Sequence, residues 1–467
     1  MNSFFSFLVS SIINVLLYYY VGFYYLIIIR IAHFTLVHLI TKYIFNLERL
    51  GEIGLIFYVM PDHKKFIMTG FMHLEGYKPN EMKEIILNRG IKNFSMLRKK
   101  LTYFFGNYYW KDVSLEEASK SIKIIDKQLN SYKDIQDYGL KEQERIFKED
   151  ELLYEFQIIK FGENDTVVLT KFDHTLSDGL GMLGFSIGLS DNYDLSLFPQ
   201  MPTISLMTML ILHLASPFYA LIALLTSIQV QIKHIVSPFK RGNKEKGNKI
   251  VELSKYFNFT KVSNAAKKMG LSFNDLLITI ISKNTKKMNV LDTKEFSGKE
   301  FVVSIPVSLR PMPKTLKEFV INNQVSNQIF KCPLVNDLSE HKKIQSVLNK
   351  YLKNPFYNMG NVLQYNIGTF FAPNFLIQYT SEETTKNVDF IISNVPGPKK
   401  PIYYAGCKVL NMVPIPTQAI VNNFILICSY DDRFSISIAS DESIKANMTD
   451  FKKMLEEDID NLILKID

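Results

Sequence analysis

The sequence is poor in cysteine and has two long stretches without charge. Its 467 residues include only three cysteines, Cys332, Cys407 and Cys428. Their odd number and the absence of a CxxC spacing exclude a disulfide framework and a cysteine-based zinc cluster. No Asp, Glu, Lys or Arg occurs in residues 4–29 or 195–232. Any essential chemistry must therefore be carried by residues other than cysteine.

The overall composition describes a folded chain on the hydrophobic side of average. Hydrophobic residues make up 47%, aromatic residues 13% and charged residues 21%, and the mean hydropathy is +0.03. These values exclude intrinsic disorder and a collagenous or low-complexity protein, and they indicate membrane contact. The length suits two or three domains. The net charge of +8 fits an anionic membrane surface, a phosphate-bearing ligand or a nucleic acid equally well.

The first uncharged stretch, residues 4–29, is long enough to cross the bilayer as a helix. It lacks the preceding basic residues and the small-residue cleavage site of a signal peptide, so we expect a retained anchor. Arg30, Lys42 and Arg49 follow it and favour a cytosolic body. The alternative is a buried core helix.

The second uncharged stretch, residues 195–232, has a core at residues 204–230 that is also long enough to span. Pro217 lies near its centre and predicts a kink or break. We expect two helical halves in the interface, or a re-entrant hairpin, because a full crossing would separate the segments on either side of it. A basic stretch follows, which predicts an exposed linker or a headgroup-binding segment. Its residues are Lys240, Arg241, Lys244, Lys246 and Lys249.

Helical and strand patterns alternate on both sides of the second stretch, which indicates an α/β or α+β architecture. We divide the chain into an N-terminal membrane anchor (residues 1–45), an N-terminal lobe (46–200), membrane-associated helices with a basic linker (201–249) and a C-terminal lobe (250–467). Residues 113–131 begin with a helix-forming run that Ser114 can cap. The elements expected with the clearest pattern are strands at 152–161, 166–172, 301–307, 323–331, 388–393, 424–429 and 434–439, and helices at 263–270, 272–287 and 448–464.

The strand at 166–172 leads directly into the sequence Asp173-His174-Thr175-Leu176-Ser177-Asp178-Gly179. A histidine held just after a strand is well placed to act as a general base, because neutral imidazole accepts a proton near pH 7. Asp178 can fix the local backbone or pair with an arginine. The alternative is a surface histidine beside a turn.

Residues 179–184 also satisfy the pattern G-x-G-x-x-G, which seats a pyrophosphate in dinucleotide-binding proteins. That fold needs an acidic residue about 20 positions further on, and no Asp or Glu occurs between Leu195 and Lys244. We therefore reject nicotinamide cofactor binding and expect these glycines to allow tight helix packing behind the histidine loop.

Further segments of the chain share an order and spacing with one family. They are Ser272-Phe273-Asn274-Asp275-Leu276-Leu277, Ile305-Pro306-Val307-Ser308-Leu309-Arg310, Asn323-Gln324-Val325-Ser326 and Ser393-Asn394-Val395-Pro396-Gly397-Pro398, with Tyr404-Ala405-Gly406 just after. With the histidine motif, these segments resemble the wax ester synthase/diacylglycerol acyltransferase family over roughly residues 50–465. The family usually has two adjacent histidines, and here Asp173 replaces the first. The role of the second histidine falls on His174.

The resemblance implies two lobes like chloramphenicol acetyltransferase, each a sheet covered by helices, with a channel between them. Together with the N-terminal transmembrane helix, this is the fold expected for the chain. In such a channel His174 would remove the proton of a hydroxyl that attacks a thioester. The side chain of Asn274, or a backbone amide, would stabilise the oxyanion. We expect Asp178 to orient the motif and Arg310 to pair with it. Other residues expected near the substrates are Asp173, Gly179, Asp275, Arg310, Asn394 and Gly397.

The function expected from the resemblance is membrane-bound transfer of a fatty acyl group from acyl-CoA to a long-chain alcohol or diacylglycerol. Acyl-CoA is then a co-substrate, and we expect no other cofactor, no metal and no nucleic acid. The alternatives are acylation of another hydroxyl lipid, such as a sterol, and a silent lipid-binding protein of the same fold. We expect the protein at the endoplasmic reticulum or plasma membrane.

Overall fold

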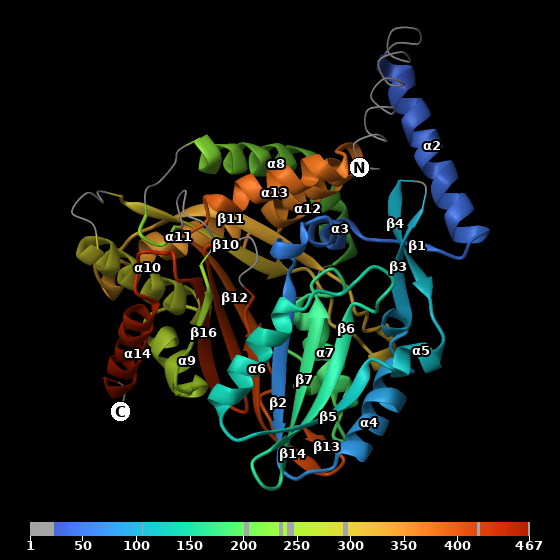
Figure 1. The fold of residues 1–467 in the computed structure, drawn as a ribbon. Coiled ribbons are helices and arrows are strands. Elements are labelled where there is room, and N and C mark those ends of the chain that lie inside the picture. The colour runs from blue at the N-terminus through green and yellow to red at the C-terminus, as the bar shows by residue number, and fades with distance from the viewer. Residues whose placement is uncertain are drawn as a thin grey trace.

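The computed structural model describes residues 23–104, 106–199, 205–232, 237–240, 247–292, 298–417 and 421–465. Within these ranges the strands form two large sheets and one small one. Helices cover the outer faces of the two large sheets, and the sheets stand next to each other as two lobes (Figure 1). The expected two-lobed α/β architecture is confirmed.

The sheet of the N-terminal lobe has six strands. In spatial order they are β13 (Tyr403–Tyr404), β14 (Cys407–Ile415), β2 (Ile67–Leu74), β7 (Asp165–Asp173), β6 (Tyr154–Phe161) and β5 (Ile122–Leu129). A separate three-stranded sheet lies beside it, made of β1 (Glu48–Arg49), β4 (Asn107–Asp112) and β3 (Lys99–Phe104). β7 lies in the interior of the large sheet, paired with β2 and β6, and it carries the histidine motif at its C-terminal end.

The sheet of the C-terminal lobe has seven strands. Its main path is β11 (Val325–Pro333), β10 (Glu300–Ser308), β12 (Phe390–Pro396), β15 (Asn423–Tyr430), β16 (Arg433–Asp441) and β8 (Lys249–Leu253), and β9 (Phe257–Asn258) also pairs with β16. β12 is parallel to β10 and β15, so its C-terminal residues reach the same edge as theirs. Asn394 lies near that end of β12.

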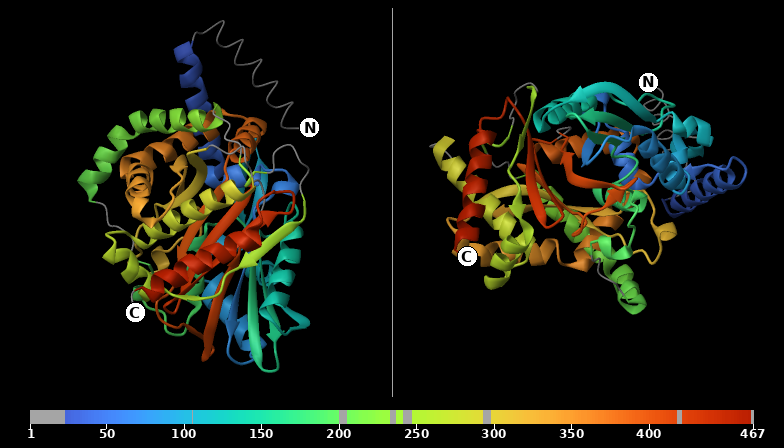
Figure 2. Two further views of the ribbon diagram at one scale, coloured as in Figure 1. Left: turned by 90° about the vertical axis from the view of Figure 1, so that its left-hand side faces the viewer. Right: turned by 90° about the horizontal axis from the view of Figure 1, so that it is seen from below.

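The helices of the N-terminal lobe are α3 (Glu52–Tyr58), α4 (Pro79–Ile85), α5 (Leu115–Ser119), α6 (Tyr132–Glu144) and α7 (Gly179–Leu189). Those of the C-terminal lobe are α9 (Phe259–Lys268), α10 (Phe273–Asp292), α11 (His341–Tyr351) and α14 (Met448–Leu464). A further layer, α8 (Leu206–Ile232), α12 (Pro355–Phe371) and α13 (Asn374–Lys386), crosses one end of the molecule, and α2 (Phe23–Tyr43) rises from that end (Figures 1 and 2).

The division into two consecutive lobes needs a correction at β13 and β14. Both strands come from the C-terminal part of the chain, expected wholly in the second lobe, yet β14 pairs with β2 in the first sheet. The chain therefore crosses from β12 to the first sheet and returns at β15. Backbone pairing across the crossover ties the two lobes together, which no local sequence pattern indicates.

The expectation of two helical halves around Pro217 was wrong, because α8 is one helix of 27 residues with this proline inside it. Proline cannot donate to the carbonyl four residues earlier, which here belongs to His213. The hydroxyl of Ser216 donates to that carbonyl at 2.7 Å instead. The carbonyl of His213 therefore has a hydrogen-bond donor despite the proline, and the helix continues past Pro217 without reversing direction.

The expected N-terminal span lies largely outside the described residues, because residues 4–22 are not among them. From Phe23 the chain is helical through α2 to Tyr43, beyond the expected end of the span. In the described part of the chain one helix, Leu206–Gln231, is long and apolar enough to cross a membrane. The described residues therefore give no support for a transmembrane helix at the N-terminus.

Two smaller elements also differ from expectation. The helix-forming run after Val113 gives only the five-residue helix α5, capped by Ser114 as predicted, and the following residues form β5. The basic linker is only partly exposed: Lys240 is buried and Lys249 starts β8, while residues 241–246 lie outside the described residues. Burial lowers the pKa of both lysines.

Candidate active site

His174 lies in a short loop that joins the end of β7 to the start of α7. The last residue of β7, Asp173, is paired with Ile67 of β2. The backbone N–H of His174 then donates to the carbonyl of Phe66 at 2.9 Å, so the loop stays attached to β2. Asp178 ends the loop as the N-cap of α7 and accepts from the backbone N–H of Gly181 at 2.7 Å. Hydrogen bonds therefore fix both ends of the loop.

The imidazole of His174 is half-buried against two aromatic rings and lines a cavity. Its ring centroid is 4.2 Å from that of Phe57 in α3 and 6.2 Å from that of Phe66. Burial lowers the pKa of His174 from its ordinary value, although the charge of Asp178 opposes this effect. Neutral imidazole is the form that accepts a proton, so this environment favours a general base at neutral pH.

Asp178 joins the two lobes at the edge of the cavity. Its carboxylate accepts from the guanidinium of Arg310 at 3.1 and 3.2 Å and from the backbone N–H of Gln324 at 2.7 Å. The side chains of Asp178 and Arg310 are only 4% and 3% exposed, so water does not screen this pair. The predicted pairing is confirmed. Arg310 itself does not line the cavity, and its other bonds go to the carbonyls of Val320 and Asn322.

Asn323, to which the sequence analysis gave no role, holds the histidine loop from the opposite lobe. Its side-chain amide donates to the carbonyls of His174 at 2.8 Å and of Thr175 at 3.2 Å. Asn323 belongs to one of the segments that match the family, which was the available signal. The loop is therefore positioned by β2 on one side and by the segment before β11 on the other.

The cavity that His174 lines has a volume of about 1000 Å³. Its walls come from α3 and the histidine loop of one lobe, from β10, β11 and β12 of the other, and from α8, α12 and α13. Apolar side chains dominate the walls, including Ile56, Phe57, Leu224 and Ile377. A cavity of this size and polarity suits a large apolar ligand.

Two asparagines meet at the C-terminal lobe's side of this cavity. The side-chain amide of Asn394 donates to the side-chain oxygen of Asn274 at 2.7 Å. Asn394 lines the cavity and Asn274 does not. Asn274, expected to face the oxyanion, lies at the start of α10 behind Asn394, whereas Asn394 lines the cavity as expected.

Three other expected substrate contacts have structural positions instead. Asp275 is buried at the start of α10, where it exchanges capping hydrogen bonds with Ser272 and accepts from Lys353 at 2.7 Å. Gly397 lies against the carbonyl of Ser429, which a Cβ would meet at 2.0 Å. The carboxylate of Asp173 is buried and accepts from the backbone N–H of Thr175 at 2.8 Å. None of the three lines the cavity, whereas Gly179 does.

The glycines that follow the motif allow close packing, as expected. A Cβ at Gly184 would lie 2.0 Å from the ring of Phe319, so a side chain there would displace this contact between α7 and the other lobe. Among the described residues, no group of three or more His, Cys, Asp or Glu side chains is arranged to hold a metal ion.

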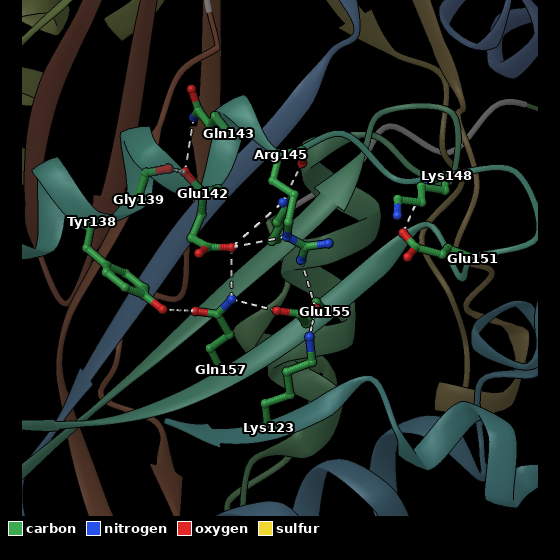
Figure 3. Close-up of polar contacts among 12 residues, drawn as sticks. Lys123, Tyr138, Gly139, Glu142, Gln143, Arg145, Lys148, Glu151, Glu155 and Gln157 are labelled. Atoms are coloured by element: carbon green, nitrogen blue, oxygen red, sulfur yellow. Dashed lines mark hydrogen bonds and ion pairs between the residues drawn. The ribbon is translucent and has the colours of Figure 1, made fainter. Parts of the chain in front are cut away.

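A second polar cluster lies on the N-terminal sheet and α6, away from the cavity walls (Figure 3). Glu155 accepts from Arg145 at 2.8 Å and from Lys123 at 2.5 Å, and Gln157 joins Tyr138 to Glu142. Lys171, next to this cluster, is fully buried and donates to the carbonyl of Arg145. Burial lowers its pKa to about 8. Each of these groups has a protein partner, which indicates a structural role.

Two sequence comparisons find similarity to known acyltransferases. Residues 343–463 match the family model described as the WS/DGAT C-terminal domain. The chain is 22% identical over 216 residues to the O-acyltransferase WSD of Acinetobacter baylyi. That match spans 44% of this chain and 44% of the relative's length.

Solved structures show the same fold at low sequence identity. The wax ester synthase/diacylglycerol acyltransferase from Marinobacter aquaeolei superposes with a TM-score of 0.58 and 14% identity, covering 90% of this chain and 99% of that one. A starter condensation domain of rhizomide synthetase, solved in complex with C8-CoA, has a TM-score of 0.56 and 10% identity, covering 90% and 94%. The fold is that of the two-lobed CoA-dependent acyltransferases. Residues 343–463 are thus similar to the C-terminal domain of wax ester synthase/diacylglycerol acyltransferases, and the fold is similar to that of the solved Marinobacter enzyme.

Proposed function

We propose that the chain is a membrane-bound O-acyltransferase that moves a fatty acyl group from acyl-CoA to a long-chain alcohol or to diacylglycerol. One observation carries the proposal: His174, with a lowered pKa, lies on the wall of an apolar cavity of about 1000 Å³ formed by both lobes. Such a cavity accepts acyl chains, and such a histidine accepts the proton of a hydroxyl.

In the proposed reaction the acceptor hydroxyl donates its proton to His174 as its oxygen attacks the thioester carbonyl. The carbon–sulfur bond then breaks, and the protonated histidine returns the proton to the departing thiolate of CoA. The products are an ester and free CoA. The acyl-CoA donor is supported by the C8-CoA bound to the rhizomide synthetase domain, which has the same fold.

The oxyanion formed during the attack needs a hydrogen-bond donor, and we assign this role to the side chain of Asn394. One of its N–H groups donates to Asn274, so the other remains available to the cavity that Asn394 lines. Asn274 then acts by orienting Asn394. A donor of this kind is worth about 2.7–4 kcal/mol in the transition state.

The membrane attachment and the location remain part of the proposal. The uncharged residues 4–29 and the uncharged α8 both support attachment, and the charges after residue 29 support a cytosolic body at the endoplasmic reticulum or plasma membrane. The shape of the cavity determines whether the acceptor is a linear alcohol, a diacylglycerol or a sterol. Asp173 replaces the first histidine of the family motif, and its carboxylate accepts a hydrogen bond from the backbone N–H of Thr175. We propose that Asp173 supports the loop around His174, so this replacement does not favour a catalytically silent protein.

The test is release of CoA and formation of labelled ester by the purified full chain, supplied with acyl-CoA and a panel of hexadecanol, diacylglycerol and cholesterol. His174→Ala should lower turnover by about 10²- to 10⁴-fold, because a general base is lost. His341→Ala is the matched control, since His341 lies on α11 outside the cavity walls. Wild-type turnover by His174→Ala would contradict the mechanism.

A further inference from the structure

The outer side of α8 is unusually apolar for an exposed protein surface. The most apolar 18 residues of this helix have a mean hydropathy of 1.9, and only 22% of them are buried. No Asp, Glu, Lys or Arg occurs among the 27 residues of α8. Large apolar side chains point away from the protein, among them Leu206, Leu210, Leu214 and Phe218, the last two being 75% and 64% exposed. A contiguous exposed surface of this kind indicates an interaction site.

Other exposed apolar side chains lie at the same end of the molecule. α2 rises beyond the layer formed by α8, α12 and α13 in both side views (Figures 1 and 2). Tyr25, Ile28 and Leu36 on α2 are each more than half exposed. α2 also contacts α12, where the rings of Phe34 and Phe370 lie 4.6 Å apart. Two apolar elements therefore face the same side.

The cavity of His174 opens within this same layer. Six of its lining residues are also large, exposed apolar side chains: Leu221, Leu224 and Ile228 on α8, Ile367 on α12, and Leu376 and Tyr379 on α13. We call these six residues the mouth of the cavity. The cavity that His174 lines is therefore bordered by exposed apolar side chains of α8, α12 and α13.

We propose that this end of the molecule docks on a lipid surface, with α8 lying flat on it, and that a long-chain lipid substrate passes from the membrane through the mouth to His174. The proposal deepens the proposed function and rests on it for the identity of the substrate. It adds the docking side and the route, so that the acyl acceptor need not cross water.

A lipid surface fits the chemistry of this face better than a protein partner does. A protein interface carries a polar rim around its apolar centre, whereas α8 is uncharged along its whole length. Arg241, Lys244 and Lys246 follow α8 in the sequence, and their positive charge suits anionic headgroups. One side of α8 packs on α12, and its outward side is apolar, so contact with lipid would remove that apolar surface from water.

The first experiment measures docking by flotation of the full chain with vesicles of equal parts phosphatidylcholine and phosphatidylglycerol. The double variant Leu214→Glu/Phe218→Glu changes two exposed residues that do not line the cavity. It should lower the affinity for vesicles by about tenfold or more, because two apolar contacts with lipid are lost and two charges are added. Any attachment through residues 4–29 is the same in the variant, the control and the wild type, so the difference reports α8. Ile124→Glu/Tyr77→Glu, exposed residues outside the layer, should bind as the wild type does.

Unchanged vesicle binding by the α8 variant would overturn the proposal. So would a dimer in light scattering that the same variant dissociates while vesicle binding persists, since a second copy would then cover the face. Flotation does not depend on turnover, so its result stands even where His174 proves not to be the base.

The second experiment tests the route with neighbouring cysteines on α8. Leu224→Cys is at the mouth, whereas Leu225→Cys is similarly exposed, at 50% against 42%, but does not line the cavity. Attachment of a bulky maleimide to position 224 should lower turnover of a vesicle-borne diacylglycerol about tenfold or more relative to position 225, with both adducts still floating. Equal turnover by the two adducts would exclude this route. The wild-type chain treated with the same maleimide is the control for modification of its own three cysteines.

Discussion

The ring of His174 packs against Phe57 of its own lobe, while Asn323 of the other lobe holds the loop that carries it. The first contact excludes water from the ring and favours the neutral form. The second fixes the backbone, so that the ring keeps its direction when substrate binds. At the scale of a residue, the state of the base therefore depends on neighbours distant in the sequence.

The first prediction at this scale concerns pH. Because burial lowers the pKa of His174, the ring stays neutral to a lower pH than free imidazole does. The acid limb of kcat/KM against pH should therefore have an apparent pKa below 6.5. Phe57→Ala removes an aromatic neighbour, admits water and should move that limb towards higher pH.

Phe371→Ala serves as the control for this profile, because Phe371 is 62% exposed on α12 and does not line the cavity. Its acid limb should coincide with that of the wild type. A limb that stays in place in Phe57→Ala would show that contact with this ring does not set the pKa of His174.

At the scale of an element, α8 is held to the protein by a close crossing with α12. Gly360 of α12 lies against the backbone of Tyr219 and Ala220, and the rings of Tyr219 and Phe356 stack at 5.4 Å. The glycine allows the two helices to approach, and the Ser216 hydroxyl keeps α8 continuous past Pro217. The layer over the cavity therefore depends on two small residues.

Gly360→Ala should destabilise the chain by about 1–3 kcal/mol, measured as a lower urea midpoint. The new Cβ would lie 2.4 Å from the carbonyl carbon of Tyr219, and backbone cannot move aside as a flexible side chain can. Gly368→Ala on the same helix is the matched control. Its Cβ would meet nothing within 4 Å, so it should be neutral or stabilise by about 0.5–1 kcal/mol. A Gly360→Ala variant as stable as the control would contradict the close crossing.

At the scale of the whole molecule, the lobes are joined at the histidine loop and at the first sheet. The buried pair of Asp178 and Arg310 makes the first junction, and β14 beside β2 makes the second. The first junction holds the histidine loop directly, and the second lies on β2, the strand that pairs with β7, so lobe docking and the geometry of the site are coupled.

Arg310→Met should destabilise the protein by about 3–5 kcal/mol, because it leaves the buried carboxylate of Asp178 without its charged partner. The double variant Asp178→Asn/Arg310→Met should cost less than the sum of the two single changes, since no lone charge remains. Lys133→Met is the surface control: its pair with Asp137 is largely exposed and should contribute less than about 1 kcal/mol. Additive costs in urea denaturation would show that the two residues do not interact.

Much of the fold follows from local patterns in the sequence. Helix α14 has its expected bounds, because Asn447 caps it and its apolar side repeats at helical spacing. β7 and β6 lie within a residue or two of expectation, since the β-branched residues of β7 and the alternation of apolar and polar residues at the start of β6 suit strands. β5 was missed because its charged, largely exposed sequence resembles a helix surface, and only pairing with β6 makes it a strand.

The sequence by itself determined His174 as the candidate base and the mixture of helices and strands, because these rest on a motif and on local patterns. The two lobes and the pairing of Asp178 with Arg310 were implied by the family resemblance. Only the tertiary structure decided that Asn394 stands in front of Asn274, that Asn323 holds the loop, and that β14 completes the other lobe's sheet. It also decided that α8 is one helix beside the cavity mouth. These arrangements depend on contacts between residues far apart in the chain, whose free energies arise only when the elements pack together.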